Sequence, residues 1–357
     1  MNEWVFVGCY TGESGGEGEG IALLRRHPVT GALARLGIVA RTPSPSFLAQ
    51  HPARPVLYAV NELDAGTVSA FSVAEDGTLT ELAVQPTGGR HPCHLAVTAD
   101  QRHLLVANYG SGSVSVHPLD AGGALREHTD LLDLAGSGPV ADRQAGPHAH
   151  MVAPDPNGSD VLICDLGSDR VWRSRLDPLS GRLAPPDPAV VAAPGTGPRH
   201  LVRAADGALL MVGELAASLS WHRPGSADGS LRPAGTVPAS TTDVENLPSE
   251  LVMGSDGRYV YVGNRGPDTV SAFAWDGAKA ELIAEVPTGG AWPRHVALLG
   301  DHLYVANERS HSVTTFRVDP DTGIPRMQGD PIGEPSPTCL LRWIAVIDGH
   351  ERQPGRR

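Results

Sequence analysis

The sequence predicts an all-β protein, a seven-bladed β-propeller with four antiparallel strands per blade. Three observations support this prediction: a short proline-containing segment recurs seven times, an apolar strand-like run follows each turn, and glycine-bearing turns separate the strands that come next. Repeats of about 40–50 residues that each contain four short strands are typical of β-propellers.

The recurring segment has the form Pro-x-(His/Glu/aromatic/Cys)-(Leu/Val/Met), with the proline one residue early in the third copy. Its third positions are separated by steps of 47, 56, 50, 50, 45 and 44 residues. We expect each copy to begin the innermost strand of a blade, which lines the central channel. The third positions are Phe47, His94, His150, His200, Glu250, His295 and Cys339.

A second marker is an apolar run that ends in a polar residue, which fits a strand buried on both faces between neighbouring blades. It occupies residues 57–62, 104–109, 161–166, 210–215, 260–265 and 303–308, with 4–10 as the seventh copy. Third strands such as 113–119 alternate apolar and polar residues, and turns such as Asp76-Gly77 lead to a polar outer strand.

The two ends of the chain should meet in one blade. The chain starts with a strand of the second type and finishes with a segment of the first type at 337–341, so that one blade is built from both termini. This arrangement closes the ring and removes a free sheet edge. We expect a single domain over 1–343 and a partly disordered C-terminal extension over 344–357.

Composition excludes several classes of partner. The 357 residues carry a formal net charge of −12, which argues against nucleic acid and against an anionic membrane. The start of the chain has no charged and apolar leader, and no 18-residue apolar run is present, so we expect a cytoplasmic protein that is a monomer or a weak homo-oligomer. The four cysteines lack C-x-x-C spacing and are expected to be buried thiols.

Polar side chains should gather at one mouth of the channel. The start of each innermost strand and the end of its antiparallel neighbour lie on the same face near the axis, and convergent polar groups in a concavity are typical of a small-molecule site. The first set is His94, His148, His150, Arg199, His200, Glu250, Arg294 and His295; the second is Glu62, Asn108, Asp165, Glu214, Asn264, Arg265, Asn307 and Glu308. The Asn and Asp side chains could instead cap their own turns.

Two features of this mouth suggest function. A strand period of two puts His148 and His150 on one face, and we expect at least one of them to be functional. Arg199 and Arg294 occupy equivalent positions and need anionic partners, which could be Glu214 or Glu250, or a ligand carboxylate or phosphate. The glycine-rich insertion at 132–146 should lie over the same mouth, unless it is an ordinary surface loop.

Six segments, in this order and spacing, resemble the seven-bladed lactonase family. They are Arg143-Gln144, Pro147-His148-Ala149-His150, Gly197-Pro198-Arg199-His200, Gly213-Glu214-Leu215, Gly263-Asn264-Arg265-Gly266 and Pro293-Arg294-His295. The family includes propeller-type 6-phosphogluconolactonases and fungal carboxy-cis,cis-muconate lactonising enzymes. The resemblance extends over residues 4–343, and the sequence departs from the family at Pro267, where His is frequent, and at Cys9, where Thr is usual.

The resemblance implies catalytic roles for His148, Glu214, Arg199 and Arg294, without an obligatory metal or organic cofactor. Arg143, Gln144 and His150 belong to the same motif block. With His94, His200, Arg265 and His295 from the predicted mouth, they complete the predicted substrate-binding set.

The expected reaction is hydrolysis of a small anionic sugar lactone, 6-phosphogluconolactone to 6-phosphogluconate, in the pentose phosphate pathway. Glu214 or His148 would act as general base or acid, and Arg199 and Arg294 would bind the anion and the oxyanion, with His150 and Gln144 orienting. Three alternatives stay open: a muconate cycloisomerase, a non-catalytic propeller that binds a small molecule or a protein, and a six-bladed Ca²⁺-dependent lactonase that uses the Asn, Asp and Glu side chains.

Overall fold

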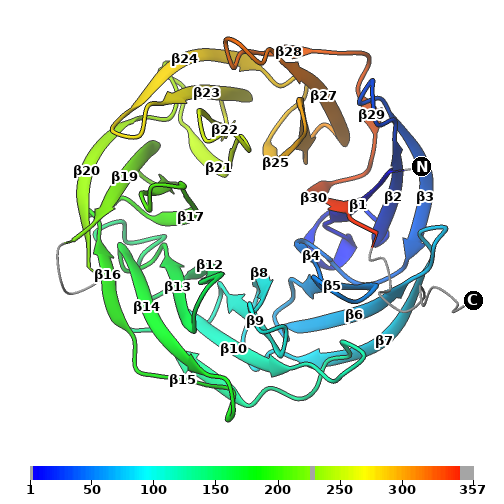
Figure 1. Cartoon of the computed structure of the whole chain (residues 1–357), viewed down its shortest axis with the longest axis vertical. Coiled ribbons are helices and arrows are strands. Elements are labelled where there is room, and N and C mark those ends of the chain that lie inside the picture. Colours follow the sequence, from blue (N-terminus) through cyan, green and yellow to red (C-terminus); the bar gives the residue numbers. More distant parts are fainter. Residues whose placement is uncertain (1–2, 226–229, 346–357) are drawn as a thin grey trace, which may run out of the picture.

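Seven β-sheets surround a central axis in the computed structural model, which describes residues 3–225 and 230–345 (Figure 1). Neighbouring strands within each sheet are antiparallel, and four strand positions lead from the axis to the rim. The predicted seven-bladed, four-stranded propeller is confirmed. Most of the predicted C-terminal extension, residues 346–357, lies outside the described residues.

Each blade contains an innermost strand, which lies next to the axis, and a second strand that pairs with it one position further out. The innermost strands are β4 (Leu48–Gln50), β8 (Pro92–Val97), β12 (Ala149–Pro154), β17 (Pro198–Arg203), β21 (Leu247–Met253), β25 (Pro293–Leu299) and β30 (Pro337–Trp343). The second strands are β1 (Glu3–Cys9), β5 (Val56–Asn61), β9 (His103–Asn108), β13 (Asp160–Asp165), β18 (Leu209–Gly213), β22 (Tyr259–Arg265) and β26 (His302–Asn307).

The third and outer strands complete the blades. The third strands are β2 (Ile21–Arg26), β6 (Thr67–Val73), β10 (Ser113–Pro118), β14 (Arg170–Asp177), β19 (Ser218–Pro224), β23 (Thr269–Trp275) and β27 (Ser312–Val318). Five outer strands are continuous: β3 (Leu33–Ala40), β7 (Leu79–Pro86), β11 (Asp130–Asp133), β20 (Leu231–Pro238) and β24 (Ala280–Pro287). In the other two blades the outer strand is interrupted. It consists of β15 (Arg182–Leu183) and β16 (Asp187–Val191) in one blade, and of β28 (Pro325–Met327) and β29 (Ile332–Gly333) in the other. A 3₁₀ helix, η1 (Gly12–Ser14), follows β1.

The ring closes as the sequence predicts. Strand β1 pairs with β30 over the register Trp4↔Trp343 to Cys9↔Pro337, which joins the two ends of the chain in one blade (Figure 1). Phe6 in β1 is fully buried, and its ring meets the edge of Trp343 in β30 at 5.8 Å. Apolar packing therefore reinforces the backbone pairing that holds the ring shut.

The hydrophobic core lies between blades. Leu105 and Val114 of one blade pack in a single buried cluster with Val152 and Ile163 of the next, and comparable clusters join other neighbouring blades. Strands β5, β9 and β26 are buried along their whole length, which explains their continuous apolar runs. This packing fixes the positions of the innermost strands that carry the mouth residues.

Bulges mark the start of many innermost strands. In the blade of β17 and β18, Pro198 pairs with Gly213 and Leu201 pairs with Met211, so that Arg199 and His200 together oppose the single residue between. Comparable register shifts occur in β8, β12, β21 and β25. A bulge redirects a side chain, and here it allows two consecutive residues to reach the channel instead of one.

Truncation of Phe6 should weaken the closing blade strongly. Phe6→Ala removes a fully buried ring that bridges the two termini, and we expect a loss of about 3–5 kcal/mol in the free energy of unfolding. Urea unfolding measures this loss. Leu36→Ala, at a half-exposed position on the outer strand of the same blade, is the control and should change stability little. Equal losses in the two variants would contradict the closure described here.

Candidate active site

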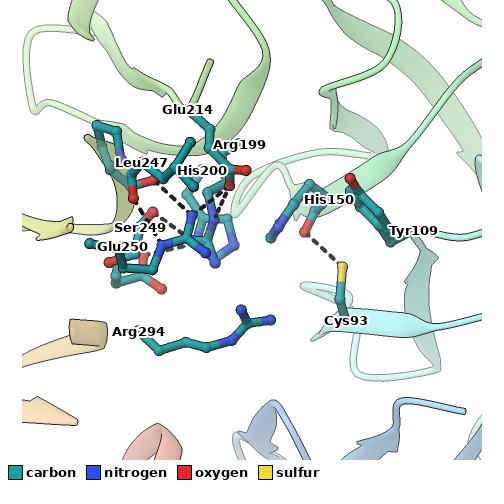
Figure 2. A network of polar contacts seen from close by, with 12 residues as sticks. Cys93, Tyr109, His150, Arg199, His200, Glu214, Leu247, Ser249, Glu250 and Arg294 are labelled. Atoms are coloured by element: carbon teal, nitrogen blue, oxygen red, sulfur yellow. Dashed lines mark hydrogen bonds and ion pairs between the residues drawn. The ribbon is translucent and has the colours of Figure 1, made fainter. Parts of the chain in front are cut away.

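A buried carboxylate at the channel mouth binds three arginines from different parts of the chain. Glu214 follows β18, and its Oε1 lies 2.6 Å from Arg143 in the loop between β11 and β12. Its Oε2 lies 2.7 Å from Arg265 at the end of β22 and 3.1 Å from Arg199 Nε in β17 (Figure 2). The Arg199 contact is an ion pair without an aligned hydrogen bond.

Three positive charges around one negative charge leave this cluster electropositive. Burial would raise the pKa of Glu214, but Arg265, Arg199 and Arg143 outweigh it and lower the pKa to about 2. Burial lowers the pKa of Arg199 and lowers that of Arg265 to about 10, so both remain charged at neutral pH. Glu214 is therefore a permanent anion that orders cations, and it is too weakly basic to be a good proton acceptor.

Arg294 reaches the same centre from β25. Figure 2 shows its side chain extended toward the space between Arg199 and Cys93. Its guanidinium lies 4.8 Å from the ring centre of Tyr10, donates a hydrogen bond to the Tyr10 hydroxyl, and has Glu308 3.7 Å away. Repulsion from Arg294 contributes to the lowered pKa of Arg199, which places the two cations within electrostatic range of each other.

His148 is held at the mouth in one tautomer. Its Nδ1 lies 2.8 Å from the backbone oxygen of Tyr109, and because a carbonyl oxygen only accepts, Nδ1 carries the proton. Its ring stacks on Tyr109 at 4.5 Å, and its backbone N–H donates to Asp165 at 2.7 Å. In the neutral ring Nε2 holds the lone pair, and it has no hydrogen-bond partner among the described residues. A half-buried imidazole in this state can accept a proton from water.

Comparison with known proteins shows the family of the chain. The sequence profile described as "Lactonase, 7-bladed beta-propeller" matches residues 4–342. The chain belongs to this lactonase family. It is 29% identical to a 6-phosphogluconolactonase of Bacillus subtilis (strain 168), over 94% of this chain and 97% of the relative.

Two further proteins are similar to this chain over most of their length. A 6-phosphogluconolactonase of Formosa agariphila is 28% identical over 89% of this chain and 93% of the relative. The solved structure of the periplasmic gluconolactonase PpgL of Pseudomonas aeruginosa superposes with a TM-score of 0.88 at 28% identity, covering 97% of this chain and 100% of that one.

Four of the histidines predicted at the mouth are buried and pack among other ring side chains, as Glu214 and Arg199 are buried among theirs. His94, His150, His200 and His295 are each at most 8% exposed. The His200 ring lies 5.3 Å from that of His94 and 5.1 Å from that of His150, and Phe47 lies 4.4 Å from His94. Burial lowers the pKa of all four imidazoles, to about 4 for His295.

Glu250 belongs to the same buried cluster as these histidines. It lies 2.9 Å from His200 Nδ1 and 3.5 Å from His295 Nε2. The bulge in β17 gives two consecutive residues different partners, because Arg199 pairs with Glu214 while His200 pairs with Glu250. His94, His150, His200 and His295 are thus packed among protein side chains, and their contact with a substrate stays a prediction.

His148 and His150 do not share a strand face. Strand β12 begins at Ala149, and its pairing shifts between Ala149 and Met151. His148 precedes the strand and stacks on Tyr109, whereas His150 is buried beside His200 and meets Tyr109 edge-on at 5.6 Å. The bulge that the alternation of residues cannot reveal separates the two imidazoles.

The insertion reaches the mouth through Arg143. Gln144 is fully buried, donates to Leu166 O and Asp169 Oδ1, both at 2.8 Å, and accepts from the Val140 N–H at 3.1 Å. Its amide therefore braces the loop that carries Arg143. Arg265 is also buried and donates hydrogen bonds to Glu214 and to Leu247 O, so it holds the Glu214 carboxylate in place.

The Asn and Asp residues that end the second strands are structural, as the turn-cap alternative predicted. Asn61, Asn108, Asn264 and Asn307 are at most 1% exposed and hydrogen-bond to neighbouring Ser, Thr or backbone groups. Asp165 accepts from the backbone N–H groups of His148 and Gly167.

Two tyrosines at the mouth were absent from the predicted site. Tyr109 stacks on His148 and lies 3.2 Å from Arg143, and Tyr10 contacts Arg294. Both directly follow a second strand, the same position that Glu214 occupies after β18. Their position after the second strand was the signal available in the sequence, but the predicted set of site residues was chosen among charged and amide side chains and histidines.

Within residues 3–225 and 230–345, no three His, Cys, Asp or Glu side chains are grouped so that they could hold a metal ion. The same residues contain no helix that is long and apolar enough to cross a bilayer. The four cysteines are buried and unpaired.

The stability of the fold should fall in acid because of Glu214. The pKa of Glu214 lies at about 2 in the folded state against 4.5 ordinarily. Its contribution to the free energy of unfolding is therefore complete above pH 4.5 and is lost as the pH falls toward 2. The shift corresponds to about 3 kcal/mol. Urea unfolding between pH 7 and pH 2 should show this loss in the wild type and not in Glu214→Gln. Parallel profiles for the two proteins would contradict the ion-pair arrangement.

Proposed function

We propose that the protein hydrolyses a sugar-derived lactone, with 6-phosphogluconolactone as the preferred substrate and 6-phosphogluconate as the product. The observation that carries the proposal is the electropositive cluster of Arg143, Arg199 and Arg265 around Glu214, together with the nearby imidazole of His148, whose Nδ1 donates to a backbone oxygen. Such a cluster attracts an anion and stabilises negative charge that develops on a carbonyl oxygen. The names of the relatives in Bacillus subtilis and Formosa agariphila support this substrate.

His148 is the proposed general base. Its Nε2 takes a proton from water as the water oxygen bonds to the lactone carbonyl carbon, and the carbonyl oxygen becomes an oxyanion. Arg199 and Arg294 are the proposed ligands of that oxyanion, because both reach the same centre (Figure 2). Arg143, which is partly exposed on its loop, is the proposed contact for a peripheral anionic group of the substrate.

Ring opening completes the reaction. As the carbonyl re-forms, the bond to the ring oxygen breaks, and the imidazolium of His148 returns its proton to that oxygen. The product is a carboxylic acid with a new hydroxyl group, and the acid loses its proton to solvent at neutral pH. Glu214 takes no part in the proton transfers and instead orders the arginines, because its pKa of about 2 makes it a weak base.

The cellular setting is part of the proposal. A role in the pentose phosphate pathway and a cytoplasmic location fit the phosphorylated substrate. The periplasmic location in the name of the Pseudomonas aeruginosa relative fits an unphosphorylated gluconolactone instead. Comparing the two lactones as substrates separates these settings.

A proton-release assay tests the function. The purified protein should accelerate the hydrolysis of 6-phosphogluconolactone above its spontaneous rate, in proportion to enzyme concentration. D-glucono-δ-lactone and carboxy-muconate are assayed in parallel under the same conditions. No acceleration with either lactone would overturn the proposal, and turnover of the muconate alone would replace it.

A further inference from the structure

A second polar cluster faces the arginine cluster across the mouth. It consists of Tyr10 after β1, Glu62 after β5, Glu308 after β26 and Arg294 of β25, and we call it the carboxylate wall. Both carboxylates and the phenol raise the pKa of Arg294, against the opposite effect of its burial, so the four groups act on one another. Two carboxylates face one guanidinium here, the reverse of the balance around Glu214.

The hydrogen bonds of the wall are incomplete. The Tyr10 hydroxyl donates to Glu62 Oε1 at 2.9 Å and accepts from Arg294, so it is satisfied. Glu62 Oε2 and Glu308 Oε2 are both shielded from solvent, yet neither receives a hydrogen bond from the described residues. The nearest cation to Glu308 Oε2 is Arg294 Nε at 3.7 Å, which is too long for a hydrogen bond.

Unmet acceptors of this kind are uncommon and call for a donor. Most buried polar atoms in folded proteins have a partner. The buried amide oxygens of Asn108 and Asn307 also lack one, but a carboxylate carries charge, and leaving it unpaired costs more. The comparison with Glu214 is direct, because both oxygens of that carboxylate are engaged by arginines. Both side chains are partly exposed, that of Glu308 by 19%, so a rotation of the carboxylate about its terminal bond would present the shielded oxygen to a ligand.

We propose that Tyr10, Glu62 and Glu308 form a subsite that binds hydroxyl groups of a polyhydroxylated anion. This inference rests on the proposed lactonase function and assigns its specificity. Glu62 and Glu308 accept hydrogen bonds from substrate hydroxyls, while Tyr10 fixes the positions of Glu62 and Arg294. The anionic group of the substrate faces the arginine cluster on the other side, and the reacting carbonyl lies between that cluster and Arg294.

The charge of the wall identifies the kind of group that it binds. An anionic group placed there would meet two carboxylates and be repelled, and a cation would compete with Arg294, which already occupies the space between them. A neutral hydroxyl donates without adding charge, and a hydrogen bond to a carboxylate is stronger than one to a neutral acceptor. The mouth therefore favours a sugar acid over a polycarboxylate such as a muconate.

Removing one substrate hydroxyl at a time, in combination with wall variants, tests the subsite. The substrates are 6-phosphogluconolactone and analogues that lack the hydroxyl at C2, C3 or C4. The variants are Glu62→Gln and Glu308→Gln, which keep the side-chain size. The control is Glu3→Gln, which removes the same charge from an ion-paired glutamate at the far end of β1. The value of kcat/KM is measured for every pair.

In the wild type, loss of a recognised hydroxyl should lower kcat/KM by about tenfold to a hundredfold. In the glutamine variant of the glutamate that binds this hydroxyl, the same loss should cost severalfold less, because a neutral amide oxygen accepts a weaker hydrogen bond than a carboxylate. Glu3→Gln should retain the wild-type penalties. A purely structural role of Glu62 or Glu308, exerted through Arg294, would instead lower kcat/KM equally for all substrates and leave the penalties unchanged.

The outcomes separate the two proposals. Deoxy analogues that are hydrolysed as well as the parent lactone, or penalties that persist in both variants, would overturn the subsite while the lactonase function stands. A wild-type protein that hydrolyses none of the lactones would overturn the function, and the subsite with it.

Discussion

Replacing His148 with asparagine should lower kcat for lactone hydrolysis by about 10²–10⁴-fold, the usual contribution of a general base. The asparagine amide can still donate to Tyr109 O, as Nδ1 does at 2.8 Å, so the local backbone should keep its arrangement. What the variant lacks is the basic nitrogen on the far side of the ring. Initial rates at saturating substrate measure the effect, and KM should change far less than kcat.

His27→Asn is the matched control for this substitution. His27 is exposed at the rim, where its Nδ1 accepts hydrogen bonds from the backbone N–H groups of Val29 and Thr30. Asparagine can fill that turn-capping role, so activity and stability should stay close to wild type. If His148→Asn retains wild-type turnover, His148 is not the base.

Loss of Arg199 should lower kcat/KM by about 10²–10³-fold, the cost of removing one donor to an oxyanion. Arg199→Met keeps most of the side-chain volume and leaves Glu214 paired with Arg143 and Arg265, so the fold should persist. Arg199→Lys keeps the charge without the forked geometry and should recover only part of the loss.

Arg35→Met is the control for Arg199. Arg35 also pairs with a buried glutamate, Glu334 at 2.8 Å, but it lies on the outer strand β3. Its loss should affect stability and spare kcat/KM. Similar losses of kcat/KM in the Arg35 and Arg199 variants would show that damage to the fold, and not the missing oxyanion ligand, explains the effect.

The fold was predictable because its repeat is written directly into the chain. The seven third positions from Phe47 to Cys339 fix the number of blades, and the strand types at the two ends fix the closing of the ring between β1 and β30. Both features depend on local patterns, apolar runs and turns, that a propeller repeats in every blade.

The partners of each site residue were not predictable, because they depend on bulges. The sequence placed Arg199 and His200 together at the mouth, whereas in the bulge of β17 Arg199 pairs with Glu214 and His200 with Glu250. The same effect separates His148 from His150. A register shift of one residue leaves no distinct signature in a sequence of this kind.

The role of Glu214 also required the three-dimensional arrangement. Its partners Arg143 and Arg265 are 71 and 51 residues away along the chain, and only the ring brings them together. Sequence reasoning left Glu214 and His148 as equal candidates for the base. Three adjacent arginines lower the pKa of Glu214 to about 2, whereas His148 has a defined tautomer, and this contrast favours the imidazole.

The central claim is that the arginines and His148 converge on one substrate position at the channel mouth. A crystal structure with the product 6-phosphogluconate bound tests it most directly. The claim predicts the product carboxylate within hydrogen-bond distance of Arg199 and Arg294, with His148 Nε2 beside it and sugar hydroxyls directed toward Glu62 and Glu308. A product that binds elsewhere, with Arg199 and Arg294 unengaged, would contradict it.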